Sequence, residues 1–421
     1  MGSKEMSQTI FEYKLKSRNP KTPHFYATIF VGVLIFTFIE SMYSNSKIHY
    51  FNLKSSHGTN NAAAAQFGSS ENHVVIAEQQ SEEAAENYDP LIPPDNVSRD
   101  ERIAWFRRQL PEIEVLKSTT LSQQFHSRVY NFLNKGCSVL HHIIWMSPAT
   151  SFGKREFLTM DSFFKANPDG CLLIVSRSMD SPRGYAILKP LLDRGFKVQA
   201  VTPDLPFLVK DTPAEPWLEQ INSGTKDPGY VPLSNNLSNL IRLTILYKYG
   251  GVYMDTDLVV LRDFSDLRNT IGAQSLDPVT RHWVILNNGV MIFDINHPIL
   301  LEFMQEFATT FNGNKWGYNG PQLVQRVIER MGGTEGFNLT ILPPRAFYPV
   351  DRVRVWRFLK KPEDESESRW VESQMNELSG REIYSVHLWN KRTKDLEIEE
   401  GSVMAKLISN HCVVCDGILR A

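Results

Sequence analysis

The sequence predicts an α/β protein built around an open, mostly parallel β-sheet. Two observations carry this prediction. Between residues 138 and 201, short apolar runs alternate with amphipathic helix patterns in the order strand, helix, strand, helix, strand. Further along, an amphipathic helix pattern over 237–249 stops at a Gly-Gly pair and is followed by another short apolar run. The second pattern predicts one more helix and strand.

The first half of the sheet is predicted to hold the strands 138–145, 171–176 and 196–201, with helices over 157–166 and 185–193 between them. Crossovers of this kind are right-handed, and such sheets bind nucleotides at the carboxyl ends of their strands. The sequence has no glycine-rich phosphate loop after these strands. A bound diphosphate would therefore have to be held by a metal ion.

Two aspartates, Asp255 and Asp257, follow the 237–249 helix and lie between the apolar runs 252–254 and 258–261. An isolated Asp-x-Asp triplet is common in solvated turns. Here the apolar runs on both sides place the two carboxylates at a break between buried strands, where they would repel each other without a cation. Mn²⁺ or Mg²⁺, hard ions that prefer oxygen ligands, suit such a pair.

This helix and its Asp-x-Asp pair resemble the core of the DxD glycosyltransferases, as do several other motifs that follow the same order along the chain. The similarity is to the lactosylceramide 4-alpha-galactosyltransferase-like (alpha-1,4-glycosyltransferase) family, plant-type branch, over about residues 137–415. The other motifs are His142-Ile143-Ile144-Trp145, Asn287-Asn288-Gly289-Val290-Met291-Ile292-Phe293, Trp316-Gly317-Tyr318-Asn319-Gly320-Pro321, Ala346-Phe347-Tyr348-Pro349 and Val386-His387-Leu388-Trp389-Asn390.

The resemblance implies a Rossmann-like GT-A fold and a retaining transfer reaction. A hexose, expected to be galactose, would move from a nucleotide-sugar, expected to be UDP-linked, to a glycan or glycolipid acceptor. Two alternatives stay open: a catalytically inactive lumenal sugar-binding or scaffold protein, and a nucleotide-sugar hydrolase. The net charge of −2 argues against nucleic acid as a partner.

The resemblance also implies roles for particular residues. The metal ligands are expected to be Asp255, Asp257 and His387. The residues expected to contact the nucleotide-sugar are Asp255, Asp257, Arg242, Asn239, Trp389 and Asn390. The residues expected to take part in catalysis are Arg242, Asn288 and Asn319. Asn239 stands where the resembling enzymes have Asp, which leaves the sugar preference open.

Several of these residues have a structural alternative. Arg242 shares a helix face with Asn239 and would otherwise be a solvated cation. Asn288 lies in a segment that also fits an ordinary turn before a strand at 290–293. Asn319 precedes the predicted helix 322–330 and could cap it. His387 ends a strand-like run, 383–386, where a lone histidine is often structural. The acidic stretch 360–380 is predicted as an exposed loop.

The N-terminal part of the chain predicts a membrane anchor. Residues 25–39 are an unbroken run of small and apolar residues, with more Lys and Arg before the run than after it. This predicts a single-pass type II protein with a lumenal catalytic domain, and the short span suits the Golgi membrane. A cleaved signal peptide is the alternative, but the leader is long and the sequence shows no clear cleavage site. The expected parts are a cytosolic tail 1–24, a transmembrane signal anchor 25–43, a flexible stem 44–98, a helical neck 99–136 and a GT-A catalytic domain 137–421. Within the catalytic domain, about residues 137–265 are expected to bind the donor and about residues 266–421 to form the acceptor side.

Four cysteines in a lumenal domain suggest disulfides. Cys137 and Cys171 each begin a predicted strand, so neighbouring parallel strands could bring them together. Cys412 and Cys415 could pair locally, and a zinc site there would need a second cysteine pair of similar spacing. Glycan acceptor motifs begin at Asn96 and Asn338, and a third, at Asn236, lies in the predicted core helix.

Overall fold

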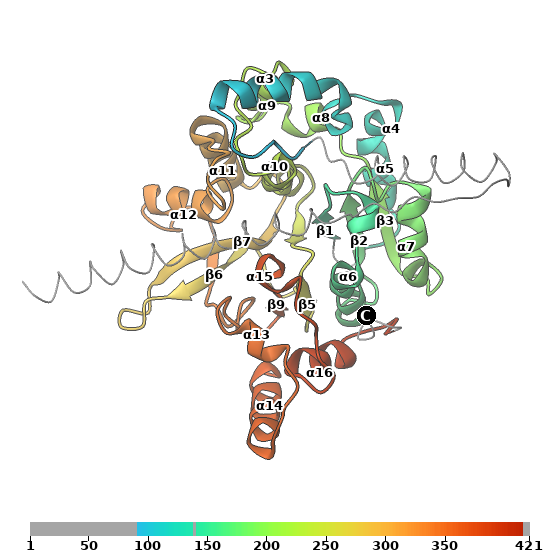
Figure 1. Ribbon diagram of the computed structural model, residues 1–421, viewed down its shortest axis with the longest axis vertical. Coiled ribbons are helices and arrows are strands. Elements are labelled where there is room, and N and C mark those ends of the chain that lie inside the picture. The colour runs from blue at the N-terminus through green and yellow to red at the C-terminus, as the bar shows by residue number, and fades with distance from the viewer. Residues whose placement is uncertain (1–90, 138–139, 416–421) are drawn as a thin grey trace, which may run out of the picture. The chain divides into compact units, whose positions relative to one another are not determined.

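A seven-stranded sheet organises the part of the chain that the computed structural model describes, residues 91–137 and 140–415 (Figure 1). These residues belong to one compact unit. The strand order is β3-β2-β1-β4-β7-β6-β8. The strands are β1 (Leu140–Ile144), β2 (Cys171–Val175), β3 (Lys197–Val201), β4 (Gly251–Met254), β6 (Thr270–Leu276), β7 (Trp283–Phe293) and β8 (Thr340–Leu342). A separate two-stranded sheet joins β5 (Leu258–Val260) to β9 (Ser385–His387).

The predicted parallel half of the sheet is confirmed. β1 pairs in parallel with β2 and with β4, and β2 pairs in parallel with β3. The other half is mixed, because β7 runs antiparallel to both β4 and β6. β7 is longer than the predicted strand at 290–293. The polar triplet Asn287-Asn288-Gly289 lies inside β7 and not in a turn before it. Asn287 pairs with Gly272 of β6, and a register shift in the β6–β7 ladder follows before Met291 pairs with Ile271.

Helices cover both faces of the sheet. Successive residues of a strand point to opposite faces, and the core divides accordingly. Leu173 of β2 and Tyr253 of β4 lie in one apolar cluster with α10, α11 and α12, whereas Leu172 and Val252 lie in another with α6 and α7. The helices of the first face are α8 (Leu205–Val209), α9 (Glu215–Asn222), α10 (Leu233–Tyr249), α11 (Pro298–Thr310) and α12 (Pro321–Arg330), and those of the second are α6 (Lys154–Ala166) and α7 (Pro182–Leu192).

The segment expected to form a helical neck contains α3 (Arg99–Gln109), α4 (Thr120–Gln123) and α5 (Phe125–Leu133). Ser98 and Glu101 form a reciprocal capping box at the start of α3. Phe106, Phe125 and Phe132 are fully buried in the same apolar cluster as α10 and the sheet. These helices therefore share the core of the domain that follows them.

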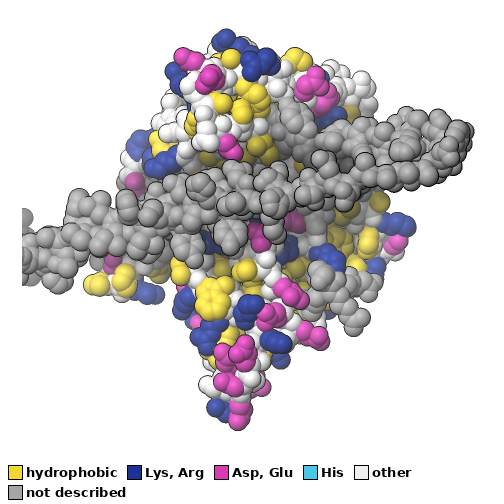
Figure 2. All heavy atoms as spheres, viewed as in Figure 1, with side chains coloured by type: hydrophobic (Ala, Val, Ile, Leu, Met, Phe, Trp, Pro, Cys, Tyr) yellow, Lys and Arg dark blue, Asp and Glu magenta, His cyan; other side chains and the backbone are white. Residues whose placement is uncertain are grey.

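The C-terminal part adds a third apolar cluster, built mainly from α13 (Val355–Phe358), α14 (Glu365–Leu378), β9 and α16 (Val403–Asn410). The prediction of an exposed loop over 360–380 is wrong, because α14 occupies most of it. Asp364 caps this helix, and Val371 and Leu378, seven residues apart, are buried on one face. The acids that suggested a loop lie on its solvent face, where Figure 2 shows acidic side chains gathered over α14.

All four cysteines are paired, Cys137 with Cys171 and Cys412 with Cys415. Both predicted pairs are thus present in the structure. The predicted tail, anchor and nearly all of the stem lie outside the described residues. Within the described part, no helix has the length and apolar character needed to cross a membrane.

Candidate active site

Two strand pairings bring the predicted metal ligands together. Asp255 follows β4, and its backbone N–H donates to the Gly289 carbonyl of β7 at 2.8 Å. Asp257 precedes β5, which pairs antiparallel with β9 so that Leu258 faces His387. The N–H of Leu388 also donates to the carbonyl of Asp257 at 2.8 Å. The β5–β9 pairing therefore holds His387 beside the Asp-x-Asp pair.

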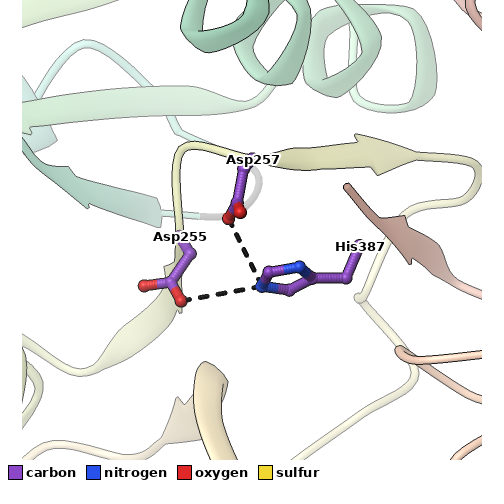
Figure 3. Close-up of side chains that lie close together, drawn as sticks. All are labelled: Asp255, Asp257 and His387. Carbon is purple, nitrogen blue, oxygen red and sulfur yellow. Dashed lines mark ion pairs between the residues drawn. The ribbon is translucent and has the colours of Figure 1, made fainter. Parts of the chain in front are cut away.

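Asp255, Asp257 and His387 point toward one another (Figure 3). The Nε2 atom of His387 lies 3.3 Å from Oδ1 of Asp257 and 3.9 Å from Oδ2 of Asp255. One potential ligand atom from each residue lies within 4.8 Å of the others. The side chains of His387, Asp257 and Asp255 are 7%, 14% and 29% exposed, so the cluster is recessed but open to solvent on the Asp255 side.

Each aspartate uses one carboxylate oxygen for orientation and presents the other to the cluster. Oδ1 of Asp255 accepts a 2.6 Å hydrogen bond from the Tyr253 hydroxyl and lies 3.2 Å from Nη1 of Arg242. Oδ2 of Asp257 accepts a 2.9 Å hydrogen bond from the Asn390 backbone N–H. The other two carboxylate oxygens, Oδ2 of Asp255 and Oδ1 of Asp257, face His387.

The ring of His387 is oriented from its other nitrogen. The backbone N–H of Trp389 donates to Nδ1 at 2.9 Å, and the two aromatic ring centres are 4.2 Å apart. A neutral ring that accepts at Nδ1 carries its proton on Nε2, facing the carboxylates. A cation bound at Nε2 would have to replace that proton.

Burial and nearby charges act in opposite directions on the three groups. Burial raises the pKa of Asp255, but the Arg242 guanidinium, His387 and Tyr253 outweigh it and lower that pKa to about 2. Burial raises the pKa of Asp257. His387 acts to lower this pKa, but the negative charge of Asp255 acts with burial, and the pKa stays raised. Burial disfavours the charged form of His387, yet Asp257 and Asp255 together raise its pKa. Asp255 is thus the more acidic of the two carboxylates.

The donor set fits a divalent cation. Two carboxylate oxygens and one imidazole nitrogen are ligands that Mn²⁺ accepts, and Mg²⁺ is commonly held by one or two carboxylates together with substrate phosphates. Three protein ligands leave positions free for phosphate oxygens and water. The residues that would hold the ion are those predicted from the sequence.

Arg242, Asn239 and Asn288 form the next layer. Nη1 of Arg242 donates to the Asn288 carbonyl at 2.7 Å, and Nδ2 of Asn288 donates to Oδ1 of Asn239 at 3.0 Å. Two glycines allow this close packing. A Cβ atom on Gly289 would lie 2.8 Å from Oδ2 of Asp255, and one on Gly320 would lie 2.7 Å from Oδ1 of Asn239. Arg242 is therefore a buried partner of Asp255 and not a solvated cation.

Asn319 has a different environment. It is buried, and its amide nitrogen donates to Oδ1 of Asn236 and to the Asn312 carbonyl, both at 2.9 Å. Its side-chain oxygen accepts the Asn312 backbone N–H at 3.0 Å. The residue at the cap position of α12 is Gly320. Asn319 thus holds the loop before α12 against α10, next to the Asn239–Asn288 pair.

The remaining predicted residue, Asn390, joins the cluster to a pair that the sequence analysis missed. Arg155 donates to the Asn390 side-chain oxygen at 3.3 Å, and the Asn390 amide donates to Glu156 at 3.4 Å. Burial raises the pKa of Glu156, and the charge of Asp257 adds to it. Both residues open α6 just beyond β1, and the rule that ligands bind at the carboxyl ends of strands could have pointed to them.

Tyr253 was the other omission. It lies in β4, two residues before Asp255, within an apolar run that indicates only a buried strand. Its ring lies 4.2 Å from the Arg242 guanidinium carbon, so it contacts both partners of the Arg242–Asp255 ion pair.

Comparison with known proteins defines the class. A family model described as a glycosyltransferase sugar-binding region containing a DXD motif matches residues 153–277, which include Asp255 and Asp257. A second model, described as the alpha 1,4-glycosyltransferase conserved region, matches residues 292–419, which include His387. The sheet, the site and these matches define a glycosyltransferase of the DXD class.

Sequence similarity to three relatives identifies the family within this class. The chain is 30% identical to the lactosylceramide 4-alpha-galactosyltransferase of Pongo pygmaeus, over 51% of this chain and 94% of that protein. It is 31% identical to the human alpha-1,4-N-acetylglucosaminyltransferase, over 50% of this chain and 58% of that protein. It is 29% identical to an uncharacterized protein of Arabidopsis thaliana, over 68% of this chain but only 44% of the length of that protein. This chain belongs to the alpha 1,4-glycosyltransferase family, and the resemblance found in the sequence is confirmed.

Proposed function

We propose that this protein is a metal-dependent, retaining hexosyltransferase of the GT-A type. It moves a hexose, galactose in the first instance, from a UDP-linked donor to a glycan or glycolipid acceptor. The observation that carries the proposal is the arrangement of Asp255, Asp257 and His387, in which each carboxylate is oriented through one oxygen and presents the other to a shared centre. Because both a galactosyltransferase and an N-acetylglucosaminyltransferase occur among the relatives, donors of both sugars are included in the test below.

Asp255, Asp257 and His387 would hold a divalent cation, which would supply electrostatic stabilisation to the diphosphate leaving group. The other residues act on the donor and on the geometry. Arg242 keeps Asp255 ionised and fixes the backbone of Asn288. The amides of Asn239 and Asn288 supply donors and acceptors suited to sugar hydroxyls. Asn319 positions the loop beside them, and Trp389 and Asn390 are proposed to cover the diphosphate.

We also infer that the catalytic domain is lumenal, in a Golgi type II membrane protein. The charge asymmetry around residues 25–39 supports this orientation. The two disulfides support it as well, because disulfides persist in oxidising compartments and are rare in the cytosol.

The test uses the full-length chain, purified in detergent from a eukaryotic secretory host. UDP or GDP release is measured over UDP-galactose, UDP-glucose, UDP-N-acetylglucosamine and GDP-mannose, with and without Mn²⁺, and with and without an acceptor such as lactose. Release that needs both metal and acceptor supports the proposal. Nucleotide release at the same rate with and without the acceptor indicates a hydrolase. Donor binding without release, in every combination, indicates an inactive sugar-binding protein and contradicts the proposal.

A further inference from the structure

The loop before α12 presents an exposed tryptophan at the border of the site. Trp316 is 49% exposed, and the Nζ atom of Lys391 lies 3.4 Å from its ring centre. Lys391 directly follows Asn390, whose backbone N–H binds Asp257. At its other end the same loop reaches Gly320, which packs against the Asn239–Asn288 pair. Both ends of the loop therefore lie beside the segments that surround Asp255, Asp257 and His387.

The loop is anchored firmly on either side of Trp316. The N–H of Val231 donates to the Gly313 carbonyl at 2.8 Å. Asn319 is held by its bonds to Asn236 and Asn312. The guanidinium of Arg326 lies 4.0 Å from the ring centre of Tyr318. A fixed backbone that leaves an indole half in water is suited to binding, because little conformational freedom is lost when a ligand covers the ring.

The position of the loop separates it from the nucleotide half of the sheet. Nucleotides bind at the carboxyl ends of parallel strands, which here are β1, β2, β3 and β4. Trp316 precedes α12, which packs on β7, and β7 lies beside β4 on the side away from β1. A ligand on Trp316 would therefore approach Asp255, Asp257 and His387 from the β7 side of the parallel strands.

From this position we infer that Trp316 and Lys391 form the acceptor-sugar subsite, an inference that rests on the proposed function. One face of the indole is held by the Lys391 ammonium. The exposed remainder of the ring can stack against the C–H face of a neutral hexopyranose, and the ammonium can donate to a sugar hydroxyl. The ligand class is a terminal hexose of a glycan or glycolipid.

The experiment compares the full-length wild type with Trp316→Ala, Trp316→Phe and Lys391→Met. The matched control is Trp356→Ala, which removes a tryptophan that is 55% exposed on α13. Binding of lactose and of methyl β-galactoside is followed by saturation-transfer NMR in the presence of UDP and Mn²⁺. UDP affinity and the thermal unfolding midpoint are measured for every variant, together with the acceptor KM when transfer occurs.

Trp316→Ala should weaken lactose binding and raise the acceptor KM roughly tenfold. Trp316→Phe should retain most of the binding, Lys391→Met should be intermediate, and UDP affinity should stay unchanged in both Trp316 variants. If neither sugar shows binding that depends on Trp316, or if UDP affinity falls in parallel, the subsite is wrong. If the wild type transfers while Trp316→Ala is normal, only the subsite fails. If sugars bind through Trp316 but no donor is consumed, only the proposed function fails.

Discussion

The hydroxyl of Tyr253 donates a 2.6 Å hydrogen bond to Oδ1 of Asp255. Burial raises the pKa of Tyr253 well above its ordinary value, so the phenol stays protonated and remains a donor. With Oδ1 held in this way, Oδ2 of Asp255 is directed toward His387. Tyr253 thus orients Asp255, one of the three proposed metal ligands.

Replacing this phenol tests its orienting role. We expect Tyr253→Phe to weaken Mn²⁺ binding by about 10–100-fold, as is typical for loss of a group that positions a metal ligand. The fold should persist, because the aromatic ring remains. Isothermal titration of Mn²⁺ into the purified protein provides the measurement. Tyr185→Phe, whose hydroxyl donates to Ala200 away from the cluster, is the matched control. Equal Mn²⁺ affinity in both variants would contradict the role assigned to Tyr253.

Asp257→Asn tests the proposed metal site directly. We expect turnover to fall by at least 10²–10³-fold, roughly the value of one strong electrostatic contact in a transition state. EDTA should produce the same loss in the wild type, and added Mn²⁺ should restore activity only there. The assay is nucleotide release in the presence of acceptor.

The control for this substitution needs an aspartate without a structural role. Asp364 is unsuitable, because it caps α14 by accepting the Glu367 N–H. Asp169, exposed in the turn after α6, is the better choice, and Asp169→Asn should be neutral. Full activity of Asp257→Asn, or of the wild type in EDTA, would show that the cluster is not a catalytic metal site.

The ion pairs of Glu306 with two arginines should stabilise the fold by an amount that decreases at acid pH. It is buried on α11 and accepts from Arg326 at 2.8 Å and from Arg330. Burial raises its pKa, but the two arginines outweigh burial and leave the pKa below the ordinary 4.5. A lowered folded-state pKa means that the stabilisation is complete above pH 4.5 and disappears as pH falls through the folded pKa.

Glu306→Gln should therefore lower the free energy of unfolding by about 1.5–3 kcal/mol at pH 7. The difference from the wild type should shrink as the pH is lowered below 4.5. Thermal unfolding at a series of pH values measures it, with Glu302→Gln, on the exposed side of the same cluster, as a near-neutral control. A difference that stays constant down to the acid limit would refute the charge-based explanation.

The two disulfides should differ in their effect on stability. The Cys137–Cys171 bond closes a loop of 34 residues, and loop-closure entropy predicts a loss of about 3–4 kcal/mol when both cysteines are changed to Ser. Cys412 and Cys415 are three residues apart, so their removal should cost less. Thermal unfolding of the two double variants tests this order. Peptide mapping under non-reducing conditions that finds four free thiols would contradict both bonds.

The three glycan acceptor motifs should be used unequally. Asn96 and Asn338 are exposed and adopt positive φ values of 58° and 48°, whereas Asn236 is 2% exposed inside α10. In a lumenal domain, glycosidase treatment should shift the mass, and changing Asn96 or Asn338 to Gln should each remove one glycan. The Asn236→Gln variant should migrate like the wild type. Absence of any shift after expression in a secretory host would contradict the lumenal orientation.

The parts of this protein that the sequence determined are those governed by local pattern. The periodicity of 138–201 and 237–249 is enough to place β1 to β3, α6, α7 and α10, because each element buries its own regular set of apolar residues. The Asp-x-Asp pair could be located for the same reason, since two strand-like runs frame it. The α14 helix shows the limit of composition, because its many acids obscured the spacing of Val371 and Leu378.

Only the tertiary structure decided how the site is assembled. The pairing of β5 with β9 joins Leu258 to His387, and the sheet places Gly289 and Asn288 beside Asp255 and Arg242. These contacts depend on hydrogen bonds and burial between segments far apart in the chain, which no local periodicity records. The sequence alone could name His387 by resemblance. Its direction, with Nδ1 held by Trp389 and Nε2 turned toward the two carboxylates, is a property of the folded chain.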